Sequence, residues 1–360
     1  MSSTRLVPLE PERVWRTYLG GRELDRWSGV EPAVDGQTPE DWIASTTPAV
    51  NPVPRPDGEG LTRARVGKDR VRLQEVLADD PDAMLGPAHA KRFGPNLGFL
   101  AKLLDASIRL HVQAHPTAAY AQQYLGKPHG KAEGYVILAT RPEVAEPYVY
   151  LGFQRPPDPD DYRRAIVEQD LGAILAPFDR VPVRPGDALV VPGGLPHAIG
   201  EGVLMLEVME PSDLVVRLEF ERGGYALPEA ARFMGRGVGL AIDLMDFRAF
   251  SVEEARRRFF CEPRVLHQHD GTARLEGLID DRHTPCFGVR RWHAEHAATL
   301  RVDRPAVALI ERGHGRIGVH GYDEGYRSGD RFFVPGSAEE LRIDPREPSA
   351  VLLIDPPLLG

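Results

Sequence analysis

Short apolar runs, each bounded by glycine or proline, are the feature that most constrains the fold of this chain. The 360 residues include 36 glycines and 33 prolines. Both residue types favour turns, because glycine tolerates backbone angles that other residues avoid and proline cannot continue a strand ladder. The runs between them are typical of strands. We expect strands over Ser107–Gln113, Gly134–Ala139, Pro147–Phe153, Ala188–Val191, Val203–Val208 and Leu214–Phe220.

Helical patterns are fewer. They predict helices over Val71–Asp79 and Pro116–Tyr124, and a helical insertion at Asp158–Pro177 that begins in "DPDDY". A second β-rich stretch runs from about Pro285 to Pro356, after a helical connector at Ser251–Phe260. The sequence "RPGDALVVPGG" near residue 184 is similar to "RSGDRFFVPGS" near residue 327. This weak internal repeat indicates a mainly β protein with two β-barrels of one type.

Composition and charge exclude several classes of protein. The net charge of −9 argues against partners such as nucleic acid or an anionic membrane surface. The two cysteines, Cys261 and Cys286, form no disulfide framework and no CxxC pair. The first residues, MSSTRLVPLEPERVW, lack the apolar core of a secretion signal, and no apolar stretch is long enough to cross a bilayer. We therefore expect a cytoplasmic protein.

Four residues form a candidate metal site. Gln113 and His115 are two apart, so on a strand they point to the same side. Glu133 and His197 come from later β-like segments. Two imidazoles, a carboxylate and an amide oxygen suit zinc or a similar divalent ion, and the ligand types also admit iron or manganese. Taken singly, each residue has a structural alternative: Gln113 could cap a strand end, and Glu133 could be a solvated charge.

Three further polar residues are candidates for the same pocket. Lys131 is two residues before Glu133 and should share its strand face, although it could also be a solvated lysine. Glu207 lies in the apolar run "VLMLEVM", where a carboxylate is costly to bury unless it is paired or used. Arg217, in "LVVRLEF", offers a planar fork suited to a sugar hydroxylate or phosphate. The structural alternative is a Glu207–Arg217 ion pair.

The segment Gly186–His197, G-D-A-L-V-V-P-G-G-L-P-H, matches the second signature of the cupin barrel: glycine, five residues, proline, one residue, glycine, two residues, histidine. The order "RLHVQAHPTAAYA", "GKAE" and "VPGGLPHAIGEGVLMLEVMEPSDLVVRLEF" resembles class I mannose-6-phosphate isomerases in their short bacterial form. This resemblance is strongest from about Gly98 to Phe220 and extends more loosely to both ends.

The resemblance implies a fold, a cofactor and roles for residues. It implies two cupin-type (jelly-roll) β-barrels with a short helical insertion near 158–177: a catalytic domain over 1–240 and a degenerate cupin domain over 241–360. It implies one divalent metal ion, with zinc favoured, and these four ligands: Gln113, His115, Glu133 and His197. It places Arg217 at the substrate and a glutamate at the position of Glu207, which makes Glu207 our first choice for the proton-transfer base and Lys131 the second.

The implied activity is interconversion of an aldose phosphate and a ketose phosphate through an enediol, with mannose 6-phosphate and fructose 6-phosphate as the family pair. Two other classes stay open: another metal-cupin enzyme acting on an unphosphorylated sugar, and a sugar-binding or regulatory bicupin without turnover. We expect a monomer or a homodimer whose partner is a small-molecule sugar phosphate. In the second barrel, Glu340 stands where His197 stands in the first, so that barrel is expected to support the fold.

One departure from the family concerns the substrate. His111 stands two residues before Gln113, where the family usually has serine. It could be a rim histidine bonded to water, or a larger, partly protonated ring that changes what the pocket accepts. A lysine that usually follows the substrate arginine is also absent from "RLEFERGGYAL". These departures concern the phosphate site and leave the metal chemistry intact.

Overall fold

The middle layer of the molecule is a seven-stranded antiparallel sheet. The structure, a computed structural model, describes residues 5–269 and 272–358. In order across this sheet the strands are β17 (Phe260–Cys261), β11 (Ala188–Val191), β8 (Glu133–Thr140), β13 (Val203–Met209), β6 (Leu100–Asp105), β3 (Glu40–Ile43) and β2 (Arg13–Val14). Both faces of this sheet are covered, so its strands are apolar along most of their length.

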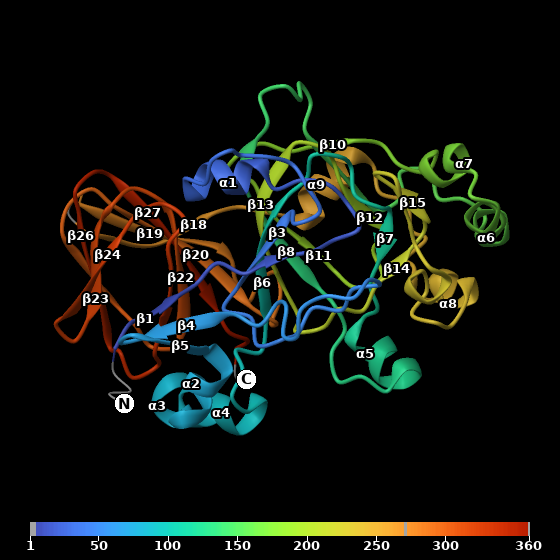
Figure 1. The fold of residues 1–360 in the computed structure, drawn as a ribbon. Helices are drawn as coiled ribbons and strands as arrows, with labels where there is room; N and C mark the ends of the chain where they lie inside the picture. The colour runs from blue at the N-terminus through green and yellow to red at the C-terminus, as the bar shows by residue number, and fades with distance from the viewer. Residues whose placement is uncertain (1–4, 270–271, 359–360) are drawn as a thin grey trace.

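A nine-stranded sheet packs on one face of the middle sheet. Its strands are β18 (Arg264–His269), β19 (Ala273–Ile279), β20 (Gly288–Ala294), β27 (Ser349–Asp355), β22 (Ala306–Arg312), β25 (Arg331–Val334), β1 (Val7–Leu9), β4 (Arg63–Val66) and β5 (Asp69–Arg72). A four-stranded sheet encloses a second core against it: β21 (Ala298–Arg301), β26 (Glu340–Pro345), β23 (Gly315–Val319) and β24 (Tyr322–Tyr326). The beginning and the end of the chain therefore meet in one sheet (Figure 1).

A five-stranded sheet covers the other face of the middle sheet. It contains β10 (Val181–Pro182), β9 (Tyr148–Leu151), β12 (His197–Ile199), β7 (Gln113–Ala114) and β14 (Val216–Arg217). Its outer face packs against α6 (Pro159–Glu168), α7 (Leu171–Leu175) and α8 (Val238–Leu244). These helices lie at one end of the molecule and the four-stranded sheet at the other (Figure 1).

The remaining elements are short. A hairpin joins β15 (Glu221–Arg222) to β16 (Tyr225–Ala226). The other helices are α1 (Arg22–Ser28), α2 (Leu73–Asp79), α3 (Pro81–Leu85), α4 (Pro87–Phe93), α5 (Ala118–Tyr120), the π-helix η1 (Ala121–Leu125), the 3-10 helix η2 (Glu229–Ala231) and α9 (Val252–Phe259). Among the described helices, none is long and apolar enough to cross a membrane.

The chain is mainly β, as predicted. Within the described ranges the strand orders of the sheets are open, and none closes into a ring. The predicted helical insertion is present as α6 and α7. Helix α6 starts where the sequence indicated: Asp158 accepts hydrogen bonds from the N–H groups of Asp160 and Asp161, and Pro159 occupies the first turn. The division at residue 240 stays a prediction, and β1, β4 and β5 pair across it into the nine-stranded sheet.

Two predicted strands are wrong in extent. Most of Ser107–Gln113 and Leu214–Phe220 is irregular, and only Gln113–Ala114 and Val216–Arg217 form strands. The reason is a side chain that takes the place of a backbone acceptor. Glu219 Oε1 accepts a hydrogen bond of 2.7 Å from the Val112 N–H, and both Glu219 oxygens also accept from the Arg109 guanidinium, at 2.6 and 2.8 Å. The regular ladder is therefore interrupted beside β7.

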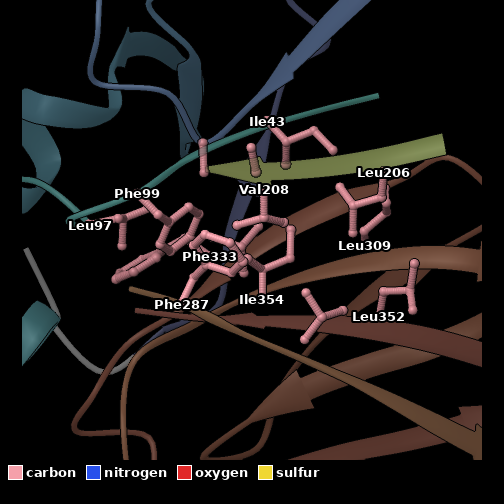
Figure 2. Packing of buried hydrophobic residues seen from close by; sticks show 14 of the residues in the cluster. Ile43, Leu97, Phe99, Leu206, Val208, Phe287, Leu309, Phe333, Leu352 and Ile354 are labelled. Atoms are coloured by element: carbon pink, nitrogen blue, oxygen red, sulfur yellow. The ribbon is translucent and has the colours of Figure 1, made fainter. Parts of the chain in front are cut away.

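Side chains on β13 point alternately to the two faces of the middle sheet, and this alternation explains how the layers hold together. Leu204, Leu206 and Val208 of β13 point into the apolar seam with the nine-stranded sheet. Figure 2 shows Leu206 and Val208 of β13 and Ile43 of β3 opposite Leu309, Phe333, Leu352 and Ile354. The intervening residues point the other way, so Met205 packs toward the five-stranded sheet and Glu207 faces the space between these layers.

Substitution of Leu352 tests how much this apolar seam contributes to the stability of the fold. It is fully buried on β27, so we expect Leu352→Ala to lower the free energy of unfolding by about 2–5 kcal/mol through lost burial and a cavity. Urea unfolding followed by circular dichroism measures the change. Val167→Ala, at an exposed position of α6, is the control and should change stability by less than about 0.5 kcal/mol. Equal effects of the two substitutions would contradict the central place given to the seam.

Candidate metal centre and active site

Two rows of side chains meet between the five- and seven-stranded sheets. In the five-stranded sheet, β7 lies between β12 and β14, and Gln113 is in register with His197 on one side and Arg217 on the other. In the seven-stranded sheet, Glu207 is in register with Tyr135 and Lys102, and Lys102 with Trp42. Cross-strand neighbours of this kind lie within contact distance on one face of a sheet. Residues from distant parts of the sequence are thereby brought to one cavity.

His115 and His197 are oriented alike. The Nδ1 atom of His115 lies 2.7 Å from the Leu214 carbonyl oxygen, and Nδ1 of His197 lies 2.8 Å from that of Leu195. Because a carbonyl can only accept, each Nδ1 carries the proton and each Nε2 presents a lone pair. Metal-ligating histidines commonly donate their second N–H to such a carbonyl. Burial lowers the pKa of His115 to about 4, which keeps this ring neutral.

Both lone pairs converge on Glu133. Nε2 of His115 lies 3.0 Å from Glu133 Oε1, and Nε2 of His197 lies 3.2 Å from Oε2. One ligand atom from each of the three residues falls within 4.8 Å of the others. Burial opposes ionisation of Glu133, but the positive charge of Lys131, whose Nζ lies 2.9 Å from Oε1, favours it, and the pKa of this carboxyl lies well below its usual range. Two lone pairs facing a buried carboxylate repel it, and a cation between them removes that repulsion.

A second observation, the surroundings of the Glu133 carboxylate, also indicates that these residues fit a divalent ion. Glu133 Oε1 is fully buried and accepts no hydrogen bond of good geometry among the described residues, although Lys131 Nζ lies 2.9 Å away. The other oxygen, Oε2, accepts a hydrogen bond of 2.5 Å from the Tyr135 hydroxyl. A buried acceptor left without a directed donor is costly. Oε1 therefore remains available for a metal ion.

Gln113 completes the predicted ligand set. Its amide nitrogen lies 3.4 Å from Nε2 of His197, and the nitrogen and oxygen of an amide exchange places by a half-turn of the group. The structure thus brings Gln113, His115, Glu133 and His197 together. Their action as ligands stays a prediction. Lys131 is also where the sequence indicated, buried beside Glu133.

Glu207 lies beside this centre with a partner that the sequence analysis missed. Its Oε2 is 3.1 Å from Lys102 Nζ, so the Glu207–Arg217 ion pair considered as an alternative is wrong. Burial raises the pKa of Glu207 to about 8, with the charge of Glu133 adding to the rise and that of Lys102 opposing it. A carboxyl with this pKa can both take and release a proton near neutral pH.

Arg217 and His111 line the same cavity. Arg217 donates one hydrogen bond of 3.0 Å to the Ala231 carbonyl, and within the described residues no carboxylate forms an ion pair with it. His111 lies with Nδ1 2.9 Å from the Glu219 carbonyl oxygen and Nε2 3.4 Å from Thr17 Oγ1. Burial, together with the charge of Arg217, lowers the pKa of His111 to about 4. A pKa this low favours a neutral ring, so of the two alternatives left open by the sequence the partly protonated one is disfavoured.

The sequence analysis missed a cluster of charges on the far wall of the cavity. Glu40 accepts hydrogen bonds from Tyr18 Oη at 2.6 Å, from Arg16 Nε at 2.7 Å and from the Trp42 indole at 2.8 Å. Lys102 Nζ lies 3.2 Å from the same carboxylate and so bridges Glu40 to Glu207. A signal was present: Lys102 interrupts the apolar run "FLAKLLD", as Glu207 interrupts "VLMLEVM".

The cavity has a small inner part and a wide outer part. The inner part holds about 50 Å³ and is bounded by Lys102, Glu207, Gln113 and Lys131. The outer groove holds about 810 Å³ and extends past Asn51, Lys127 and Ser212. Arg16, Thr17, Asp213, Val215 and Arg217 border both. Both arginines thus stand where the outer groove meets the inner part, and of the predicted metal ligands Gln113 lines that inner part.

Together these features define the class: a mainly β protein in which two buried histidines and a buried carboxylate are placed to hold a metal ion next to a charged pocket. Residues 60–153 match the family model described as phosphomannose isomerase type I, catalytic domain. A mannose-6-phosphate isomerase from Streptococcus mutans is 26% identical over 337 residues, 92% of each chain. The resemblance to class I mannose-6-phosphate isomerases predicted from the sequence is confirmed.

Solved structures agree with this assignment of fold. The mannose 6-phosphate isomerase of Bacillus subtilis superposes with a TM-score of 0.74 at 18% identity, covering 97% of this chain and 99% of that one. A zinc-bound mannose 6-phosphate isomerase superposes with a TM-score of 0.71 at 15% identity, covering 98% and 100%. The likeness therefore extends through the catalytic layers and the C-terminal sheets.

Removing one imidazole tests the metal centre. We expect wild-type protein to hold one zinc ion per chain after dialysis and His197→Ala to hold less than about a tenth of that, because even the loss of a residue that only supports a ligand costs about 10- to 100-fold in affinity. Plasma mass spectrometry against protein concentration measures the ratio. His314→Ala, at an exposed histidine paired with Glu347, is the control and should keep full occupancy. Full occupancy in His197→Ala would exclude this site.

The neutral state of His111 predicts a pH dependence of stability. Its pKa is about 4 in the folded chain against 6.5 for the free side chain. The unfolded chain therefore binds the proton first, and stability present above pH 6.5 is lost as the pH falls toward 4. At pH 5 the loss amounts to about 2 kcal/mol. His111→Ser should lack it when both proteins are unfolded in urea with a chelator present at pH 7 and pH 5. Parallel losses in the two proteins would mean that His111 is protonated in the folded state.

Proposed function

We propose that this chain is a zinc-dependent aldose–ketose isomerase that interconverts mannose 6-phosphate and fructose 6-phosphate. The observation that carries the proposal is the convergence of the lone pairs of His115 and His197 on the buried Glu133, beside a carboxyl that titrates near neutral pH. The similarity to mannose-6-phosphate isomerases supports the sugar pair. A zinc ion bound there would polarise the carbonyl and hydroxyl oxygens at C1 and C2 and stabilise negative charge on them.

The shape of the cavity favours an extended, open-chain sugar. The inner part is too small for a whole hexose, so only the reacting carbons C1 and C2 fit beside Gln113 and Glu207. The remainder of the sugar lies in the outer groove, with Arg217 and Arg16 at the narrowing. Arg217, which no carboxylate pairs among the described residues, offers its free guanidinium donors to an oxyanion.

Glu207 is the proposed base. Its carboxylate removes the proton from C2 of the aldose, and the electrons of that C–H bond form the C1–C2 double bond of the enediol. The same carboxyl then returns the proton to C1, while the C2 hydroxyl proton moves to the C1 oxygen, so that the ketose has the same atoms as the aldose. Lys102, at 3.1 Å from Glu207, stabilises the carboxylate form before the proton is taken. Lys131 lies beside Glu133 and balances its charge.

The architecture, the compartment and the oligomeric state complete the proposal. The sheet pairs on either side of the apolar seam are proposed to be two cupin-type jelly rolls, since the two G-D…V-P-G segments form β11 and β25. Cys261 and Cys286 are both free thiols, which fits the reducing cytoplasm. We propose a monomer or a homodimer acting on a small-molecule sugar phosphate in that compartment.

Glu207→Gln tests the assignment of the base. We expect it to keep one zinc ion and the wild-type fold and to lose exchange of the C2 proton by about 100-fold or more, the usual contribution of a positioned base. Exchange of the C2 proton of mannose 6-phosphate with deuterium oxide, followed by NMR, measures it. Glu276→Gln is the matched control, because Glu276 is also buried but lies in the C-terminal sheet beside His293. Near wild-type exchange in Glu207→Gln would make Lys131 the next candidate.

A panel of sugars tests the substrate. Wild-type protein with zinc should isomerise mannose 6-phosphate faster than mannose, because Arg217 and Arg16 border the groove that holds the far end of the sugar. A preference for the unphosphorylated sugar would overturn the phosphate part of the proposal and leave the isomerase chemistry in place. Zinc binding without turnover of any sugar would instead favour a sugar-binding protein.

A further inference from the structure

One ion pair crosses the apolar seam between the catalytic sheet and the C-terminal strands. Arg331 Nη1 of β25 lies 2.6 Å from Asp41 Oδ2 of β3, and their side chains are only 2% and 3% exposed. The two residues are 290 positions apart. Around them the seam is built of aliphatic and aromatic side chains such as Ile43 and Phe333 (Figure 2).

The pair is held in a defined geometry at both ends. Arg331 donates two more hydrogen bonds, from Nε and Nη2, to the Gly329 carbonyl at 3.2 and 2.9 Å. Asp41 Oδ1 accepts the Glu12 N–H at 2.8 Å. Apolar side chains in place of a buried ion pair are often no less stable. Unlike an apolar contact, an ion pair is directional, so it fixes the position of β3 relative to β25.

Asp41 is the neighbour of a residue in the active-site cavity. Successive residues of a strand point to opposite faces, so Asp41 faces Arg331 while Glu40 faces the cavity. Glu40 receives hydrogen bonds from Arg16, Tyr18 and Trp42 and lies 3.2 Å from Lys102. Lys102 in turn lies 3.1 Å from Glu207. A shift of β3 therefore moves the carboxylate that holds Lys102 against the proposed base.

We propose that Arg331 is a positioning residue of the active site: through Asp41 it sets the position of β3, and through Glu40 and Lys102 it aligns Glu207. This inference rests on the proposed isomerase function. It gives the C-terminal strands a part in catalysis although none of their described residues lines the cavity. A displacement of about 1 Å at a reacting group can cost 100-fold in rate, so a small shift of β3 suffices.

The test compares Arg331→Met with a matched variant, Arg290→Met. Arg290 forms a buried ion pair with Asp355 in the same nine-stranded sheet, at 2.6 Å and with side chains 16% and 8% exposed, and neither residue lies on a strand of the catalytic sheet. Each zinc-loaded protein is assayed with mannose 6-phosphate well below its own unfolding temperature. We expect Arg331→Met to lower kcat about 10-fold with KM and zinc content unchanged, and Arg290→Met to change kcat less than about twofold.

A second comparison separates positioning from general support. In the Glu40→Gln background, Arg331→Met should lower kcat by less than about twofold more, because the path to Glu207 is already broken. Arg331→Lys, which keeps a charge for Asp41, should recover part of the lost rate. If Arg331→Met does not fold, the Asp41→Asn/Arg331→Met double variant leaves neither charge buried alone and should show the same fall in kcat.

The outcomes distinguish this inference from the proposed function. If the wild-type enzyme is active and Arg331→Met keeps the wild-type kcat, only the positioning role is overturned. The same holds if the falls in kcat caused by Glu40→Gln and Arg331→Met multiply in the double variant. Equal losses in Arg331→Met and Arg290→Met also overturn it, since they would show only a general need for buried pairs. A wild-type protein that binds zinc and isomerises no hexose phosphate overturns the proposed function, and this inference with it.

Discussion

The seven-stranded sheet is buried on both faces, and the rest of the molecule depends on that constraint. Side chains alternate along each strand, so β3, β6 and β13 must satisfy two environments at once. Ile43, Leu103 and Leu206 enter the apolar seam with the nine-stranded sheet. The residues between them point toward the five-stranded sheet, where the cavity lies. The same burial that holds the layers together therefore determines which side chains reach the active site.

Charges buried in such a site are costly unless they are paired. Here the buried carboxylates Glu133 and Glu40 each have several polar partners. Glu133 is met by Lys131 and two imidazoles, and Glu40 by Arg16, Tyr18, Trp42 and Lys102. Each partner holds another in place, so the polar groups cannot rearrange singly. Glu207 differs, because burial raises its pKa even though Lys102 lies 3.1 Å away. Preorganised partners around one poised carboxyl are what proton transfer between adjacent carbons requires.

The C-terminal strands matter to this chemistry through geometry. They stand behind the catalytic sheet, and β1 from the start of the chain pairs with β25 near its end. The Arg331–Asp41 pair is a buried polar link within this apolar contact. The catalytic layer is supported in this way on its back face, and the cavity lies on its other face, between this layer and the five-stranded sheet, where the outer groove opens.

The sequence by itself determined several of the strands and brought out the four residues of the candidate metal site. Apolar runs between glycine and proline predicted β8, β9, β11 and β13, and the spacing of Gln113 and His115, with the histidine after Pro-Gly-Gly, predicted residues that do meet. Only the tertiary structure decided the partners. Glu207 pairs with Lys102 rather than Arg217, and His111 is neutral because it is buried near a guanidinium. Two expected strands are short because the Glu219 side chain replaces a ladder acceptor. The physical reason is common to all three: spacing along one strand fixes which face a residue occupies, whereas burial and the identity of a partner depend on strands that are distant in sequence.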